Sequence, residues 1–229
     1  MRNLVEWFYN KIKGRHLLLD PKISSSDLFF VSVSQGVGIM RGVLRLLPSV
    51  FIGKSVKLKS RKNLHIGKGA TIKDYCTLDA LGHSGIKVGK ASTIGAYSFI
   101  QVSGSLTDLG LKVHIGDNVG IGEFAHIGGA GGVLIGNDTI IGSYFSVHPE
   151  NHNFSHSATL IKNQGVNRKG IIIGANCWIG AKVTVLDGSR IGDGCVVAAG
   201  AVVKGNYPDN VIIGGVPSKI LGDRISGKK

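Results

Sequence analysis

The chain has 229 residues, 35 of them glycine, and 43% of its residues are hydrophobic but only 7% aromatic. This composition excludes a disordered or collagen-like chain and indicates many short strands joined by tight turns. Lysine and arginine number 27 against 14 acidic residues, a net charge of +13. The surplus favours a polyanionic partner such as a phosphate-bearing cofactor, a nucleotide sugar or an anionic membrane. Nucleic acid is not an expected partner, because the chain has no zinc-finger spacing, RRM signature or run of aromatic residues among basic ones.

The cysteines and the start of the chain indicate the cellular location. Three cysteines cannot form a closed set of disulfides, and no CxxC pair occurs. No secretory apolar segment follows the charged start. We therefore expect a reduced, cytoplasmic protein, with peripheral contact at the inner face of the membrane as the alternative.

Residues 1–50 differ from the rest of the chain. Leu4, Phe8 and Ile12 recur at helical spacing, and residues 28–47 form a second apolar stretch that glycines and arginines interrupt. The uncharged part, residues 28–40, is too short for a membrane span of about 20 residues. Two interpretations stay open: a helical cap over one end of the repetitive region that follows, which we favour, and a pair of helices in the membrane interface.

From residue 66 to residue 203 an aliphatic residue returns every six positions, and the register restarts at four breaks. Six residues make one strand and one corner, and three such units close a triangle of eighteen residues. The period therefore predicts an all-β fold, a parallel β-helix whose coils stack at strand spacing. Glycine follows eleven of these positions, and we expect it to supply the unusual backbone angles of the corners. The eighteen positions are Ile66, Ile72, Leu78, Val88, Ile94, Ile100, Ile115, Ile121, Ile127, Ile135, Ile141, Val147, Ile173, Ile179, Val185, Ile191, Val197 and Val203.

Strand alternation predicts that the position two before each aliphatic residue also points inward. Cys76, Cys177 and Cys195 all occupy this position, so we interpret them as buried packing residues rather than nucleophiles or metal ligands. The breaks in the register place the loops, with twenty extra residues before position 173 as the longest insertion. Because a coil tolerates insertions only at its corners, a loop at about residues 153–172 is expected to project.

Three histidines lie within nine residues where this loop begins: His148, His152 and His156. Histidine titrates near neutral pH, so a histidine in such a loop can act as a general base. An arbitrary loop histidine is more often a solvated, hydrogen-bonding residue. The clustering of three at the largest insertion favours chemistry.

The sequence resembles the hexapeptide-repeat acyltransferases of the left-handed β-helix superfamily. It is most similar to sugar O-acetyltransferases of surface-polysaccharide clusters and to galactoside and maltose acetyltransferases, over about residues 52–220. The likeness depends on an ordered set of motifs: NHNF at 151–154, NQG at 163–165, IGANCWIGAKVTVLDG at 173–188 and YPDNVIIGGVPSKIL at 207–221.

The resemblance implies a left-handed coil, against the usual right-handed crossover rule. It also implies a homotrimer with acetyl-CoA between neighbouring prisms. A histidine would act as general base on a sugar hydroxyl that attacks the thioester, in the biosynthesis of surface polysaccharide such as capsule or O-antigen. We divide the chain into an N-terminal helical segment at 1–50, the β-helix acyltransferase domain at 51–221 and a basic tail at 222–229.

The position within the coil indicates which of the three histidines is the general base. In the galactoside acetyltransferase pattern the base lies seventeen residues after the first aliphatic residue of its coil, and Ile135 plus seventeen is His152. His148 copies the family's His-Pro dipeptide at a different coil position and is the second choice, ahead of His156. The loss of a general base typically lowers turnover by about 10²–10⁴-fold.

The resemblance also implies cofactor-binding residues. The family's Trp-Ile-Gly element falls on Trp178, whose ring is expected to face outward. Backbone N–H groups near Ala181 and Ala199 would hold the pantetheine arm and polarise the thioester oxygen. Lys204 and Lys219 match positions that contact the CoA phosphates.

The resemblance further implies acceptor-binding residues at Glu123 and Asn118. The rival reaction is N-acetylation of an amino-sugar nucleotide, which needs the same cofactor and a base. Two other classes stay open: a γ-carbonic-anhydrase-like protein with zinc held by His114, His148 and His152, and a non-catalytic scaffold. No metal is expected for an acyltransferase, and the zinc proteins lack the Trp-Ile-Gly element and the C-terminal motif.

Overall fold

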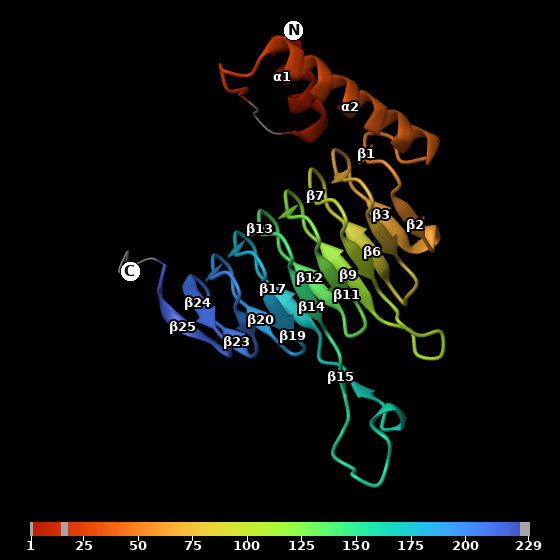
Figure 1. Ribbon diagram of the computed structural model, residues 1–229, viewed down its shortest axis with the longest axis vertical. Helices are drawn as coiled ribbons and strands as arrows, with labels where there is room; N and C mark the ends of the chain where they lie inside the picture. Colours follow the sequence, from red (N-terminus) through yellow and green to blue (C-terminus); the bar gives the residue numbers. More distant parts are fainter. Residues whose placement is uncertain (1, 15–17, 225–229) are drawn as a thin grey trace.

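The computed structural model describes residues 2–14 and 18–224, of which those beyond residue 50 wind into one triangular coil (Figure 1). Three sheets, named A, B and C below, form its faces. Successive strands pass from sheet A to B to C and then to the next coil, and neighbouring coils pair in parallel. The predicted parallel β-helix is confirmed.

The strands are short, and each sheet collects one strand from every coil. Sheet A contains β1 (Phe51–Ile52), β4 (Thr71–Ile72), β7 (Thr93–Ile94), β10 (Gly120–Ile121), β13 (Ile140–Ile141), β18 (Trp178–Ile179), β21 (Val196–Val197), β24 (Val211–Gly215) and β25 (Ser218–Asp223). Sheet B contains β2 (Lys57–Lys59), β5 (Thr77–Asp79), β8 (Phe99–Gln101), β11 (His126–Gly128), β14 (Ser146–His148), β19 (Thr184–Leu186) and β22 (Val202–Val203). Sheet C contains β3 (Leu64–Ile66), β6 (Gly85–Val88), β9 (Lys112–Ile115), β12 (Val133–Ile135), β17 (Ile171–Ile173), β20 (Arg190–Ile191) and β23 (Asn206–Tyr207).

The residue pairs between neighbouring coils confirm the predicted register of aliphatic residues. Ile135 pairs with Ile115 on one side and with Ile173 on the other, although a long insertion separates the last two in sequence. Seventeen of the eighteen predicted residues are buried, and Ile66 is half-buried. The same columns continue beyond the predicted ends, through Ile52 at the first end and Ile213 at the last. Strand alternation therefore fixes the whole core from the sequence.

The explanation predicted for the corner glycines is wrong. Gly95 and Gly122 follow aliphatic residues, yet neither has a positive φ; the left-handed angles belong to Tyr97 and Phe124, two residues further along. The glycines are needed because coils touch at the corners. A Cβ on Gly95 would lie 2.3 Å from the carbonyl carbon of Gly122 in the next coil.

The three cysteines are buried, as predicted. Burial raises the pKa of the Cys76 and Cys177 thiols to about 11, so little reactive thiolate forms at pH 8. We expect native protein to react with an aromatic disulfide reagent far more slowly than denatured protein, in which all three thiols become accessible. A fast stoichiometric reaction of folded protein at pH 8 would contradict this placement.

Every long insertion leaves the coil at one corner, between sheet B and sheet C, named the B–C corner below. It holds residues 80–84, 102–111 and 149–170, between β5 and β6, β8 and β9, and β14 and β17 respectively. The last of these projects from the prism as predicted (Figure 1). It contains the antiparallel pair β15 (Asn151–His152) and β16 (Val166–Asn167) and a 3₁₀ turn, η2 (Ile161–Asn163); a similar turn, η1 (Arg61–Asn63), precedes β3.

Two helices lie at the first end of the coil: α1 (Arg2–Lys13) and α2 (Ser25–Leu44) (Figure 1). Ser24 caps α2 by accepting a hydrogen bond from the N–H of Asp27. Gly38 and Gly42 are buried where α2 packs on β1. A Cβ on Gly42 would meet the carbonyl oxygen of Val50 at 2.2 Å, so glycines that interrupt the apolar stretch in sequence are the points of closest approach. At the other end, β25 folds back antiparallel on β24.

Replacing Gly42 with alanine is expected to push α2 away from β1, because the added methyl group overlaps backbone rather than a side chain that can move. Limited proteolysis should then cleave within residues 14–50 faster, while the coil keeps its thermal transition. Gly36→Ala is the matched control, since nothing lies within 4 Å of the place that a Cβ on Gly36 would occupy and alanine favours the helix. Equal cleavage of both variants would contradict the packing argument.

Candidate active site

The motif residues of the projecting loop hold the loop itself together. The side chain of Asn153 donates to the carbonyl oxygen of Gln164 at 3.1 Å and accepts from Asn167 at 2.9 Å. Gln164 in turn accepts from the N–H of His156 and donates to its carbonyl oxygen, at 3.1 and 2.9 Å. Asn153 of the NHNF motif and Gln164 of the NQG motif are therefore structural, and they shape the loop that carries His152.

A buried carboxylate fastens the root of this loop to the coil. Asp187, at the B–C corner of the next coil, accepts hydrogen bonds from the N–H groups of Lys169 and Gly170, each at 2.9 Å, and from the side chain of Asn151 at 3.2 Å. One side chain thus holds both the outgoing and the returning segment. Asp187 lies inside a quoted motif, but its partners could not be read from the sequence.

An arginine links the loop to a second insertion. The Arg168 guanidinium contacts Glu150 at 2.6 Å and Asp108 at 2.9 Å. Although partial burial acts to lower the pKa of Arg168, its hydrogen bonds to the two carboxylates raise it above the ordinary value. This bridge could not be read from the sequence, because Asp108 and Arg168 lie sixty residues apart.

Removing the Asp187 carboxylate is expected to loosen the projecting loop. Asp187→Ala leaves two backbone N–H groups without their acceptor, at roughly 1–3 kcal/mol for each group that stays buried. Amide hydrogen exchange in residues 149–170 should accelerate, while core strands keep their protection. Asp193→Ala is a matched control, since Asp193 also accepts from a backbone N–H (Ala175, 2.7 Å) but at another corner. Unchanged loop exchange in Asp187→Ala would refute the anchoring role.

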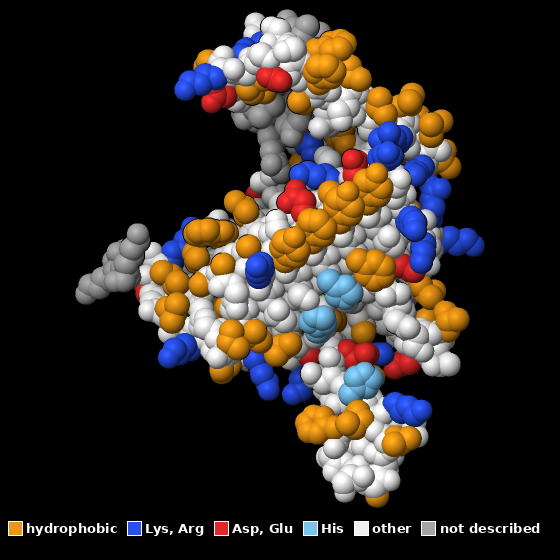
Figure 2. Space-filling view, viewed as in Figure 1, with side chains coloured by type: hydrophobic (Ala, Val, Ile, Leu, Met, Phe, Trp, Pro, Cys, Tyr) orange, Lys and Arg blue, Asp and Glu red, His pale blue; other side chains and the backbone are white. Residues whose placement is uncertain are grey.

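The three candidate histidines do not form one cluster. His152 is exposed on β15, where its backbone faces Val166, and His156 is exposed further out on the loop. His148 remains on the coil surface, where its Nε2 lies 2.7 Å from Ser146 Oγ. Its ring stacks on His126, with centroids 5.7 Å apart. Figure 2 shows histidine side chains gathered on the coil face and, apart from them, at the loop.

His126 is a neighbour that sequence analysis did not single out. Its ring lies between His148 and Phe99, whose centroid is 5.6 Å away. Partial burial and then the charge of His148 lower the pKa of His126. His126 is therefore mainly neutral at pH 7.

Most of the predicted cofactor residues lie across sheet B from the projecting loop. Trp178 faces outward from sheet A, as predicted, and is 60% exposed. Ala181 and Ala199 are both exposed and stack at the corner between sheets A and B, the A–B corner. Each carries only a methyl group, so the backbone there is open to a slender ligand. Lys204 is exposed where sheet B ends, and Lys219 is exposed on β25.

The two acceptor candidates are engaged with other side chains and lie at different corners. Glu123, at the A–B corner, pairs with Lys73 at 2.9 Å and accepts from Ser143 at 3.1 Å. The Lys73 contact is the main cause that lowers the pKa of Glu123. Asn118 lies at the corner between sheets C and A, where it donates to Asp138. Within one chain neither is brought together with His152.

His114, from the zinc hypothesis, lies on sheet C, whereas His148 ends a strand of sheet B. Burial, then Lys112 and Lys87, lower the pKa of His114. Among residues 2–14 and 18–224, no group of three histidine, cysteine or acidic side chains is placed to hold a metal ion.

An aromatic stack runs along the A–B corner and was not predicted. Tyr75, Tyr97, Phe124 and Tyr144 stack with ring centroids 5.0, 5.1 and 5.0 Å apart. Figure 2 shows them as a diagonal apolar stripe. Each lies three residues after a register position, so the six-residue period contained the signal. In the next coil the column continues at Lys182, which shares their positive φ.

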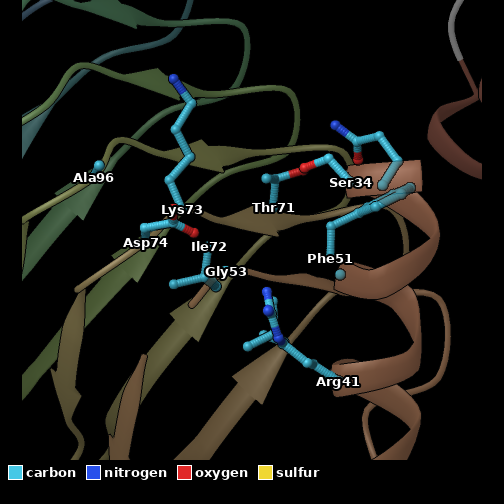
Figure 3. A pocket seen from close by; sticks show the side chains of 12 residues that line it. Ser34, Arg41, Phe51, Gly53, Thr71, Ile72, Lys73, Asp74 and Ala96 are labelled. Atoms are coloured by element: carbon cyan, nitrogen blue, oxygen red, sulfur yellow. The ribbon is translucent and has the colours of Figure 1, made fainter. Parts of the chain in front are cut away.

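A cavity of about 290 Å³ lies in the seam between α2 and the first coils (Figure 3). Ser34 and Arg41 enter it from α2, and Thr71 and Asp74 line it from the coil. Figure 3 shows Arg41 reaching from the helix toward Gly53 and Ile72. None of the predicted site residues lines this cavity, so it is separate from the candidate active site.

The comparisons with known proteins agree with this fold. A family model described as bacterial transferase hexapeptide (six repeats) matches residues 170–205. The match falls on the last coils of the β-helix. It is 37% identical over 116 residues to the "Putative lipopolysaccharide biosynthesis O-acetyl transferase WbbJ" of Escherichia coli, covering 48% of this chain and 59% of that protein. It is 33% identical over 112 residues to the galactoside O-acetyltransferase of Escherichia coli, covering 49% and 54%. The chain thus spans little more than half the length of these relatives.

Solved structures support the architecture. A crystal structure of AntD, an N-acyltransferase from Bacillus cereus in complex with dTDP-4-amino-4,6-dideoxyglucose and coenzyme A, covers 77% of this chain and 81% of its own. The TM-score is 0.52 and the sequence identity 22%. At this identity the likeness shows the fold alone, which is the left-handed parallel β-helix implied by the sequence resemblance.

Proposed function

We propose that this protein transfers an acetyl group from acetyl-CoA to a hydroxyl group of a sugar in surface-polysaccharide biosynthesis, with His152 as general base. The observation that carries the proposal is the projecting loop. Its shape is held by side-chain hydrogen bonds of Asn153, Gln164 and Asp187. His152 stays exposed at the root of the loop, on a coil similar to those of sugar O-acetyltransferases.

The chemistry follows from the residue types. As general base, His152 would take the proton of the acceptor hydroxyl as the hydroxyl oxygen attacks the thioester carbonyl. The tetrahedral oxyanion would be stabilised by backbone N–H groups at the Ala181–Ala199 corner. Its collapse would break the carbon–sulfur bond, form the acetyl ester and release CoA thiolate, which takes up the proton. Trp178, Lys204 and Lys219 are proposed to bind the cofactor.

A homotrimer is part of the proposal. The loop that carries His152 leaves the coil at the B–C corner, whereas Ala181 and Ala199 lie at the A–B corner. Sheet B lies between the two corners. A neighbouring copy that places its own A–B corner against the projecting loop would complete the site. We expect three subunits by light scattering, and acetyl transfer to disappear on dilution to monomers.

The reaction is tested by measuring thiol release from acetyl-CoA with a panel of acceptors. The panel contains neutral sugars, nucleotide sugars, a lipid-linked saccharide and an amino-sugar nucleotide. Acceptor-dependent thiol release with an alkali-labile ester product supports the proposal. An amide product on the amino sugar would assign N-acetylation instead, and no release with any acceptor under conditions where the chain is folded and trimeric would refute acetyl transfer.

A further inference from the structure

The outward face of α2 is apolar, which is unusual for a helix at a protein surface. Six of its seven exposed large hydrophobic residues fall on one face of the helix, at one, four, eleven, fourteen and fifteen positions after Phe29, and only Val31 lies off this face. Their exposed fractions run from 48% for Val33 to 76% for Leu44. The face, named the outer stripe, consists of Phe29, Phe30, Val33, Met40, Val43 and Leu44.

The coil does not cover the outer stripe, because α2 uses its opposite side for packing. Leu28, Gly38 and Gly42 are the buried residues of α2, and the two glycines contact the strand β1 and the segment before it. The helix is long and apolar enough to cross a membrane, but only by length and composition. Since its inner side rests on the coil and carries Arg41 into the seam (Figure 3), α2 is suited to lie along a membrane surface rather than across it.

Basic residues continue the outer stripe at the C-terminal end of α2. Leu46, 84% exposed, shares a surface depression with Arg61 and Lys62. Arg61 reaches over and donates to the carbonyl oxygen of Arg45. The neighbouring strand β2 adds two exposed lysines. Figure 2 shows hydrophobic side chains along α2 followed by Lys and Arg side chains on the adjoining edge of the coil.

This combination points to one partner. An apolar helix face beside a basic cluster matches the boundary between acyl chains and anionic headgroups. A second copy of the chain fits less well, because it carries the same net charge of +13 and would bring its own basic cluster to the contact. We propose that the protein docks on anionic membranes through α2, with the outer stripe in the acyl boundary and Arg61 and Lys62 on lipid phosphates. This surface goes beyond acetyl transfer and does not depend on it.

Flotation of the full-length protein with vesicles tests the docking. We expect it to float with phosphatidylcholine vesicles that contain phosphatidylglycerol, and to stay behind with phosphatidylcholine alone. Binding should fall as salt is raised, because screening weakens contacts to lipid phosphates. Washing with alkaline carbonate should release the protein, as it does a surface-bound helix.

Two variants separate the apolar and the basic contributions. Phe30→Ser with Val33→Ser removes the centre of the outer stripe and is expected to lower vesicle partitioning at least about tenfold. Arg61→Gln with Lys62→Gln should lower it to a similar extent on anionic vesicles. Leu106→Ser is the matched control, since Leu106 is 82% exposed on a loop of the coil. Its partitioning should equal that of the wild type.

The proposal is overturned if the wild type ignores anionic vesicles at low salt, if Leu106→Ser loses as much binding as the stripe variant, or if carbonate fails to release the protein. A stripe variant that changes the oligomeric state and leaves flotation unchanged would assign the face to a second copy. Because the substituted residues are exposed, thermal transitions should match. Acetyl transfer to a soluble acceptor should persist in every variant, so failure here is distinguishable from failure of the proposed enzyme activity.

Discussion

His152→Ala is expected to lower kcat for acetyl transfer by about 10²–10⁴-fold, the usual contribution of a general base. KM for acetyl-CoA should change little, because none of the residues proposed to bind the cofactor lies on the projecting loop. Stability should change by less than about 0.5 kcal/mol, since the side chain is exposed. Initial rates of thiol release, with the acceptor that gives the highest rate, measure the effect.

His156→Ala is the matched control for this prediction. Both histidines are exposed on the same loop, and the backbone of His156, which a side-chain substitution leaves in place, makes the bonds to Gln164. The control should keep near wild-type turnover. If His152→Ala is fully active and His148→Ala is not, the base is the histidine that contacts Ser146 and His126 on the coil. Wild-type rates in all three variants would exclude these three histidines as the general base.

Gly122→Ala is expected to destabilise the coil by about 1–3 kcal/mol or more, as overpacking does in a well-packed interior. A Cβ at Gly122 would lie 2.5 Å from the backbone nitrogen of Ser143 in the next coil. The contact is backbone to backbone, so it is relieved only by separating two coils. The loss should register as a lower urea midpoint with an unchanged m-value.

Gly120→Ala, two residues away in the same coil, is the matched control. It separates the backbone clash from the intrinsic conformational preference of alanine. Nothing lies within 4 Å of a Cβ at Gly120, and neither glycine has a positive φ. Alanine should therefore be neutral at Gly120 or stabilising by up to about 1 kcal/mol. Equal losses at both positions would mean that corner contact is not what demands glycine.

Sequence analysis predicted the site unevenly, and the reasons are physical. It located the projecting loop and its histidines, since an insertion interrupts a regular period wherever it occurs. It could not find that Arg168 joins Glu150 to Asp108, because two separate insertions meet only when their coils stack. It also treated Gly38 and Gly42 as interruptions of an apolar stretch, whereas packing on β1 makes them contact points.

By itself, the sequence determined the parallel coil, the inward residues and the presence of a long projecting loop. A period of six with strand alternation leaves no freedom in which side chains face the core. The tertiary structure alone decided which surface residues meet. Sheet B separates His152 from the Ala181–Ala199 corner. His148 stacks on His126 instead of lying beside His152. Such neighbours come from different coils, so their proximity is set by stacking and by the variable insertions between coils, which no local pattern encodes.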